Sequence, residues 1–214
     1  MAVSRRGVET AYRRERRIAR VVGGDVAGID EAGRGPLAGP VVAAAVVLDP
    51  SDPIDGLGDS KKLTPRARER LFAEIRSRAV GIGIGWAGHG LIDRINILRA
   101  THFAMRRAVE RLPHAPSHLL VDGLPVPGLP CRHTALVKGD SRCASIMAAS
   151  IVAKVVRDRH MIRLAKRFPE YGFERHKGYP AVVHREALER VGPCVHHRRT
   201  FSGVRERIPE GAHR

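Results

Sequence analysis

Two adjacent acids, Asp30 and Glu31, stand directly after the apolar residues 26–29 and before a glycine-rich turn. A second apolar run, rich in β-branched residues, follows this turn at residues 40–48. Burying an unpaired charge is costly, so apolar strands seldom end in neighbouring carboxylates that have no partner. We therefore expect two buried strands whose connection carries acids that hold a ligand.

The remainder of the chain alternates strand-like and helix-like patterns. Further strands are predicted at residues 80–88, 117–123 and 132–137. Helices are predicted at residues 65–78, 91–112, 143–168 and near 183–191. Residues 26–31, 40–48 and 80–88 are expected to form antiparallel neighbours, and the first and fourth strands can lie side by side. This order predicts an α/β protein with one mixed five-stranded sheet flanked by helices.

The length of 214 residues suggests one main domain with smaller appendages. The expected parts are a basic N-terminal segment at residues 1–24, a main domain at 25–168, a helical C-terminal extension at 169–203 and a disordered tail at 204–214. Residues 5–20 fit a short basic helix or a frayed arm, and residues 49–63 fit a polar loop. In the helix at 143–168, one face is expected to carry Ile151, Val155 and Ile162, with Lys154 and Arg157 off it.

The balance of charge indicates a polyanionic partner. Lysine and arginine together number 38 against 22 acids, which gives a net charge of +16 and a pI near 11.1. Nucleic acid is the partner that such a surplus favours, although codon bias toward arginine is an alternative explanation. No apolar run approaches the roughly 20 residues of a membrane span, and the N-terminus does not resemble a signal peptide. A monomeric cytoplasmic protein without membrane contact is expected, and the three cysteines suggest no disulfide framework.

Two more acids stand where predicted elements end or begin: Asp122 closes the strand at 117–123, and Asp140 precedes the helix at 143–168. If the first and fourth strands are neighbours, Asp30 and Asp122 meet at one end of the sheet. Carboxylates this close repel unless cations neutralise them or one is protonated. Divalent ions such as Mg²⁺ accept oxygen ligands of this kind, and two of them support displacement at phosphorus. The acids therefore favour a metal-dependent nuclease, although singly each fits a turn, a helix cap or an ion pair.

The glycine-rich turn has the spacing Gly33, Gly35 and Gly39, which is not the G-x-G-x-x-G of dinucleotide-binding loops. A strand pattern rather than a helix follows it, which further disfavours that interpretation. Glycines instead allow the backbone amides of Gly33 and Gly35 to approach a nucleic-acid groove closely. Arg34 between them can reach a phosphate.

The segment "GIDEAGRGPLAGPVVAAAV" closely resembles the N-terminal signature of bacterial ribonuclease HII. The resemblance continues through "DSKKLTPRARERL", "INILRATHFAMRRAV", "LVDG", "VKGDS", "AASIVAKVVRDR" and "HKGYP", in the expected order over residues 26 to 180. It implies an RNase H-like fold and an endonuclease that cuts the RNA strand of RNA–DNA hybrids. It also implies incision 5′ of single ribonucleotides in duplex DNA, leaving 3′-hydroxyl and 5′-phosphate ends.

The resemblance also assigns residues. By motif position, Asp30, Glu31 and Asp122 hold Mg²⁺ or Mn²⁺, and Asp140 completes a catalytic set expected to hold two ions. Asp158 competes for the fourth place, but a structural ion pair explains it more simply. The domain at 25–168 is then the catalytic domain, and the extension at 169–203 completes the substrate site.

The nucleic-acid contacts implied by the resemblance lie outside the acids. Gly33, Arg34 and Gly35 match the stretch that senses the 2′-hydroxyl, and Tyr179 matches a tyrosine that stacks on the sugar beside the cut. Without the resemblance, Tyr179 reads as an ordinary core residue. The remaining candidates are Lys61 and Lys62 for phosphate, and Ser145, Lys154, Arg157 and His176 for backbone contacts or support. Two other functions stay open: a non-catalytic hybrid-binding protein, and another nuclease of the same fold such as a junction resolvase.

Overall fold

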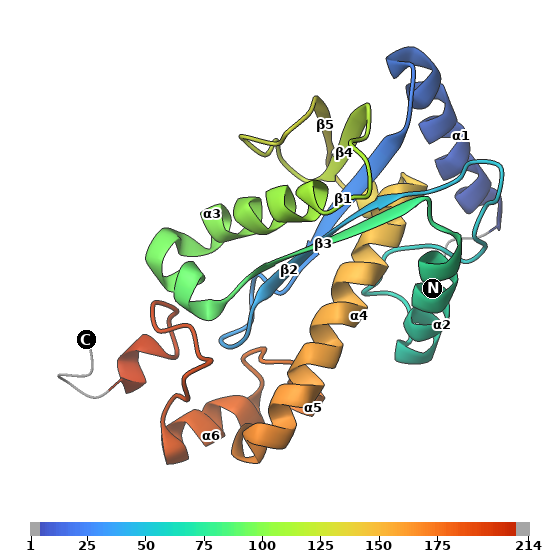
Figure 1. The fold of residues 1–214 in the computed structure, drawn as a ribbon. Helices are drawn as coiled ribbons and strands as arrows, with labels where there is room; N and C mark the ends of the chain where they lie inside the picture. Colours follow the sequence, from blue (N-terminus) through green and yellow to red (C-terminus); the bar gives the residue numbers. More distant parts are fainter. Residues whose placement is uncertain (1–4, 209–214) are drawn as a thin grey trace.

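The structure, a computed structural model, describes residues 5–208, in which a five-stranded mixed sheet carries helices on both faces (Figure 1). The strands are β1 (Val26–Ala32), β2 (Val41–Val47), β3 (Gly81–Ala87), β4 (His118–Asp122) and β5 (His133–Leu136). The longer helices are α1 (Arg5–Val22), α2 (Pro65–Arg78), α3 (His89–Glu110), α4 (Ala144–Arg167) and α6 (Val182–Val191), with the single-turn α5 (Phe173–His176) between the last two. The predicted α/β class and mixed sheet are confirmed.

The sheet order is β3-β2-β1-β4-β5. β1 pairs antiparallel with β2, and β2 pairs antiparallel with β3, as the sequence predicted. β1 and β4 run parallel with Ile29 opposite Val121. Because Asp30 and Asp122 each follow one of these paired residues, both acids emerge at the same end of the sheet.

Each face of the sheet has its own hydrophobic core. Alternate side chains of a strand point to opposite faces, so Ala44 and Val46 of β2 pack with α1, α2 and α4, whereas Ala43 and Ala45 pack with α3. Both faces of β2 are therefore buried, which accounts for its unbroken run of apolar residues.

The alternating glycines of β3 allow α3 to lie directly on the strand backbone. A Cβ atom at Gly83 or Gly85 would lie 1.9 Å from the carbonyl oxygen of Ala108 or Ala104, respectively. No side chain fits at this distance, so glycine at both positions is a packing requirement. The pattern Gly-Ile-Gly-Ile-Gly is thus explained by helix packing on one face of the strand.

Helix α3 is kinked near its start rather than continuous. Asn96 has a φ of 67° and a ψ of 166°, a non-helical conformation that residues other than glycine rarely adopt. Its side-chain oxygen accepts a hydrogen bond from the Arg99 amide at 3.1 Å and so caps the helix that follows. The predicted single helix at 91–112 is therefore two helical pieces joined at Asn96.

The basic N-terminal segment forms a helix, α1, which belongs to the core. Val8 and Tyr12 are buried, and the Tyr12 hydroxyl accepts a hydrogen bond from the Ile54 amide at 3.0 Å. Ile54 and Leu57 are also fully buried. Residues 49–63 are thus not a plain polar loop, because two apolar side chains anchor the segment beneath α1.

A buried carboxylate links α1 to the start of α4. Glu15 Oε1 accepts hydrogen bonds from the Ser145 amide at 2.7 Å and the Ser145 hydroxyl at 2.9 Å. A negative charge is favourable at a helix N-terminus. The cost of removing the Glu15 charge from water outweighs these favourable contacts, so burial raises the pKa of Glu15 to about 7.

The burial pattern of α4 differs from the prediction in its second half. Ile162, expected on the core-facing side, is 42% exposed, whereas Arg157, expected off that side, is 1% exposed. The reason is a change of partner along the helix. α4 extends past the sheet, where Met161 and Leu164 pack against the C-terminal extension instead (Figure 1). The face of α4 that packs against the extension is therefore rotated relative to the face that packs against the sheet.

The segment after residue 203 also differs from the expected disordered tail over its described part. Val204 is fully buried in the cluster of the C-terminal extension, and residues 205–207 form a 3₁₀ turn. Residues 209–214 lie outside the described residues. Residues 204–208 therefore continue the extension.

We expect Gly85→Ala to destabilise the fold, because the new methyl group would collide with the backbone of α3. Overpacking of this kind costs about 1–3 kcal/mol in the free energy of unfolding, measurable by urea denaturation. Gly90→Ala is the matched control, since a Cβ at Gly90 meets nothing within 4 Å. Equal stability of the two variants would contradict direct packing of α3 on β3.

Glu15 should make stability depend on pH. Its folded pKa of about 7 exceeds its ordinary value of 4.5, so the fold favours the protonated form. This stabilisation is complete below about pH 4.5 and is lost as the pH rises through 7. The stability of wild type relative to Glu15→Gln should fall over this range by up to about 3 kcal/mol. Urea unfolding at several pH values measures it, with exposed Glu9→Gln as the control; a flat difference would contradict the prediction.

Candidate active site

Three carboxylates from separate stretches of chain meet at one end of the sheet. One oxygen from each of Asp30, Asp122 and Asp140 lies within 4.8 Å of the others. Asp30 lies near the end of β1, Asp122 is the last residue of β4, and Asp140 lies in the 3₁₀ turn at Gly139–Ser141. This arrangement, called the acid cluster below, matches the oxygen ligands that hard divalent cations accept.

Hydrogen bonds from the chain fix the orientation of the acid cluster. Asp122 Oδ1 accepts the amides of Gly139 at 2.7 Å and Asp140 at 3.4 Å, which ties the third acid to the second. Asp30 Oδ1 accepts the Glu31 amide at 2.7 Å.

Two serines form a short hydrogen-bonded chain that ends at Asp30. Ser150 of α4 hydrogen-bonds to Asp30, and its hydroxyl lies 2.8 Å from the hydroxyl of Ser60. Sequence reasoning missed both serines as site residues. Each stands inside one of the quoted motifs, but nothing in a single sequence shows that either faces an acid.

The cluster is electrostatically unfavourable without a cation. Burial raises the pKa of Asp30 well above its usual range, and the neighbouring carboxylates of Glu31 and Asp122 raise it further. The pKa of Asp140 is also raised, first by burial and then by Asp122. A proton or a divalent cation would relieve this repulsion.

Glu31 lies at the edge of the cluster rather than within the group of three. Its Oε1 is 3.4 Å from Nη1 of Arg34. Burial raises the pKa of Glu31, and the nearby guanidinium opposes this shift. Arg34, predicted to reach phosphate, therefore contacts Glu31 in the protein alone.

Both predicted phosphate-binding lysines act on Asp140, and Lys61 also acts on Asp30 and Glu31. Burial acts to lower the pKa of Lys61, but the carboxylates of Asp30 and Asp59 outweigh it and the pKa is raised. Lys62 points outward, with its Nζ 3.4 Å from Asp59 Oδ2. Lys61 thus interacts with more of the acids than Lys62 does.

A pocket of about 380 Å³ opens beside the acid cluster. Its lining unites the nucleic-acid candidates, apart from Lys62, with other residues near the acids: Glu31, Ala32, Gly33, Arg34, Gly35, Ser60, Lys61, Lys154 and Tyr179. The Tyr179 side chain is 42% exposed, so it is not an ordinary core residue. Arg34 and Tyr179, about 145 positions apart in the chain, thus line the same pocket.

The remaining candidates make contacts within the protein. Asp158 accepts a hydrogen bond from Lys154 at 2.8 Å, so it is an ion-pair partner outside the acid cluster. Ser145 binds Glu15, and His176 Nε2 lies 2.8 Å from the Tyr171 carbonyl oxygen. These residues support the architecture around the site.

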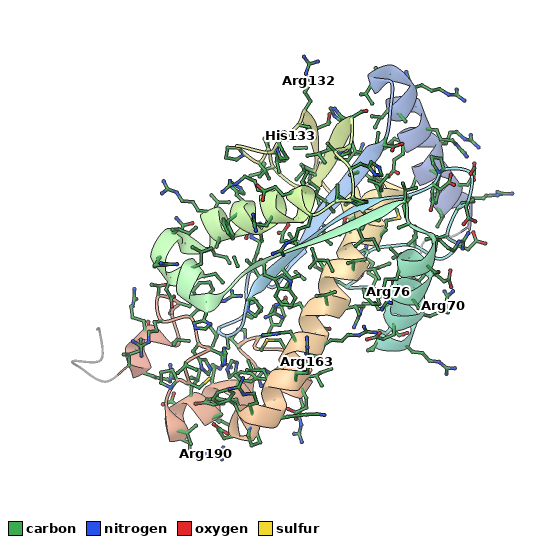
Figure 2. The ribbon with its side chains drawn as sticks, in the orientation of Figure 1. Arg70, Arg76, Arg132, His133, Arg163 and Arg190 are labelled. Atoms are coloured by element: carbon green, nitrogen blue, oxygen red, sulfur yellow. The ribbon has the colours of Figure 1, made fainter. Side chains whose placement is uncertain are left out.

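Arginine side chains spread over much of the surface. Figure 2 labels Arg70 and Arg76 on α2, Arg163 on α4 and Arg190 on α6. All four are exposed, so the positive surplus is available to a polyanion. No helix within residues 5–208 is sufficiently long and apolar to span a membrane.

Known proteins match this chain over most of its length. The family model described as Ribonuclease HII matches residues 27–204. A Ribonuclease HII of Maricaulis maris is 60% identical over 182 residues, which cover 84% of this chain and 83% of that relative. The crystal structure of ribonuclease H2 from Pyrococcus horikoshii has a TM-score of 0.71 and 32% identity, covering 85% and 96% of the two chains. A chain of the PCNA:RNase HII complex from Archaeoglobus fulgidus has a TM-score of 0.70 and 29% identity, covering 83% and 95%.

We expect Asp30→Asn to stabilise the protein in the absence of divalent cations, because it removes one charge from the acid cluster. The gain should be about 2–4 °C in melting temperature, which corresponds to about 1 kcal/mol. Saturating Mn²⁺ should then raise the melting temperature of wild type more than that of the variant.

The control for this measurement is Asp158→Asn, which removes an acid outside the cluster. Thermal unfolding of all three proteins with and without Mn²⁺ gives the comparison. Identical Mn²⁺-induced shifts in wild type and Asp30→Asn would rule out a cation held by Asp30.

Proposed function

The chain belongs to the ribonuclease HII family and is a type II ribonuclease H, an endonuclease acting on RNA–DNA hybrids; we propose that it also incises duplex DNA 5′ of a single embedded ribonucleotide. The observation that carries the proposal is the position of the acid cluster beside the pocket of Gly33–Gly35 and Tyr179. A cutting centre and a surface suited to a sugar–phosphate backbone are thus adjacent. That it acts as a monomer in the cytoplasm stays a prediction.

The donor set fits Mg²⁺ or Mn²⁺. Asp30, Asp122 and Asp140 would hold the ions, with Glu31 at the edge as a further ligand, and we infer two ions because these four carboxylates together offer oxygen ligands for both. When bound, the ions supply Lewis-acid chemistry for in-line displacement at phosphorus. Only hard oxygen donors are present in the cluster, which favours these ions over softer metals.

The chain itself positions the substrate. Lys61 places a positive charge beside the acids, where it offsets the charge of an incoming phosphate. Arg34 can exchange its contact with Glu31 for a phosphate oxygen, because that contact is long at 3.4 Å and Arg34 is half exposed. Orientation of the scissile phosphate over the acid cluster is therefore assigned to these two cations.

Recognition of a lone ribonucleotide requires a contact with its 2′-hydroxyl, which distinguishes RNA from DNA at a given site. We assign this contact to the backbone of Gly33–Gly35, because glycine leaves the backbone open to close approach. Tyr179 adjoins the turn and exposes its ring to the pocket, so it is placed to stack on the neighbouring sugar.

The decisive assay uses Mg²⁺ and a DNA duplex that carries one ribonucleotide. We expect a single incision on the 5′ side of the ribonucleotide, leaving 3′-hydroxyl and 5′-phosphate ends. Asp122→Asn should lower kcat by at least about a hundredfold, because it removes a ligand from the site that stabilises the transition state.

An all-DNA duplex of the same sequence and a four-way DNA junction are the control substrates. Incision of the junction but not of the ribonucleotide-containing duplex would favour a resolvase and overturn the proposal. Tight binding of the ribonucleotide substrate without any incision would indicate a non-catalytic binding protein.

A further inference from the structure

Two buried arginines from distant parts of the chain hold the turn that contains Gly33–Gly35. Arg157 belongs to α4, and Arg198 lies in the segment that follows α6; they are 1% and 0% exposed, respectively. Buried charges usually pair with an opposite charge. Within residues 5–208, however, the hydrogen-bond partners of both guanidinium groups are backbone carbonyls of the β1–β2 connection.

Arg198 binds both sides of the turn. Its Nη1 donates to the Arg34 carbonyl at 2.8 Å, and its Nη2 donates to the Gly33 carbonyl. Its Nε donates to the Gly39 carbonyl at 3.0 Å. A single planar group therefore fixes three carbonyls, which sets the separation of the two sides of the turn.

Arg157 supports the same turn from the direction of α4. Its Nε donates to the Pro40 carbonyl at 2.9 Å, and its Nη2 donates to the Ala38 carbonyl at 3.3 Å. A Cβ atom at Gly33 would lie 2.0 Å from Arg157 Nε, and Gly33 has a φ of +97°. Glycine is thus required here on two grounds, and the turn lies directly on the guanidinium group.

Tyr179 adjoins both the turn and Arg157. The guanidinium carbon of Arg157 lies 5.9 Å from the centroid of the Tyr179 ring, within the range of a cation–π interaction. A Cβ atom at Gly35 would lie 3.7 Å from Cε1 of Tyr179. The position of the Tyr179 ring relative to the turn therefore depends on Arg157, which contacts both.

A pair of histidines connects Tyr179 to the segment that carries Arg198. The Cys194 amide donates to His197 Nδ1 at 2.9 Å, so the proton of His197 lies on Nε2. That proton is donated to His184 Nε2 at 3.0 Å, which leaves the His184 proton on Nδ1 for the Tyr179 carbonyl at 2.8 Å. His197 directly precedes Arg198, so one segment holds both the ring and the turn.

We propose that Arg157 and Arg198 are positioning residues that fix the Gly33–Gly35 turn against Tyr179 and thereby set discrimination between ribose and deoxyribose at the cut. The inference rests on the proposed function. Its physical basis is geometric: a misplacement of about 1 Å is enough to weaken a directional contact strongly. Lysine keeps the charge of either arginine but lacks the planar fork that binds several carbonyls.

The test is a binding comparison with Arg157→Lys and Arg198→Lys, each combined with Asp122→Asn to prevent cleavage. Kd is measured in Mg²⁺ for a duplex with one ribonucleotide and for the same duplex made only of DNA. The ratio of the two Kd values reports recognition of the 2′-hydroxyl. We expect each lysine variant to reduce this ratio by about tenfold or more, while affinity for the all-DNA duplex changes by less than about twofold because net charge is preserved.

Arg159→Lys in the same background is the matched control, since Arg159 is an exposed residue of α4 that pairs with Glu69. It should leave the ratio unchanged. An unchanged ratio in folded Arg157→Lys and Arg198→Lys would overturn the inference. A parallel loss of affinity for both duplexes would overturn it too, because the arginines would then act through overall charge or stability.

Folding of each variant is checked by thermal unfolding. If Arg198→Lys does not fold, Arg157→Lys decides, because it removes two hydrogen bonds to the turn rather than three. A ratio of one in the Asp122→Asn parent would overturn the proposed reading of the 2′-hydroxyl itself. This outcome can be told apart from failure of the arginine inference, because it is seen in the parent before either arginine is changed.

Discussion

Three carboxylates whose oxygens lie within 4.8 Å repel one another, and the rest of the fold holds them together against that repulsion. Parallel pairing of β1 with β4 brings Asp30 and Asp122 to one end of the sheet. The amides of Gly139 and Asp140 then bind Asp122 and draw the third acid inward. The energy of hydrophobic packing on both faces of the sheet thus maintains a site that a divalent cation would stabilise.

The acid cluster and the pocket beside it depend on two different parts of the chain. The sheet supplies Asp30 and Asp122 and the 3₁₀ turn supplies Asp140, whereas the C-terminal extension supplies Tyr179 and Arg198. Helix α4 contacts both, because its first half packs on the sheet and its second half packs on the extension. Buried arginine is suited to this junction, since one guanidinium group can satisfy several backbone carbonyls at once.

Strand-end acids were predictable because local patterns reveal them: an apolar run followed by Asp30 indicates where a strand stops. The residues that contact those acids were not predictable, because Ser150 reaches Asp30 only through tertiary packing. Arg157 was misplaced because helical periodicity assumes one partner along the whole helix, and α4 changes partner. Arg198 and Glu15 carry no sequence signal at all, because burial of a charged residue depends on donors or acceptors supplied from far along the chain.

The packing of α4 also sets a fixed distance between the acid cluster and the glycine turn. Ser150, which supports Asp30, and Arg157, which supports the glycine turn, are seven residues apart on one helix, about 10.5 Å along its axis. One inserted residue between them would rotate Arg157 by about 100° relative to Ser150. Surface loops can change in length at small cost, whereas this two-turn stretch of helix cannot be lengthened or shortened without displacing the glycine turn relative to the acid cluster.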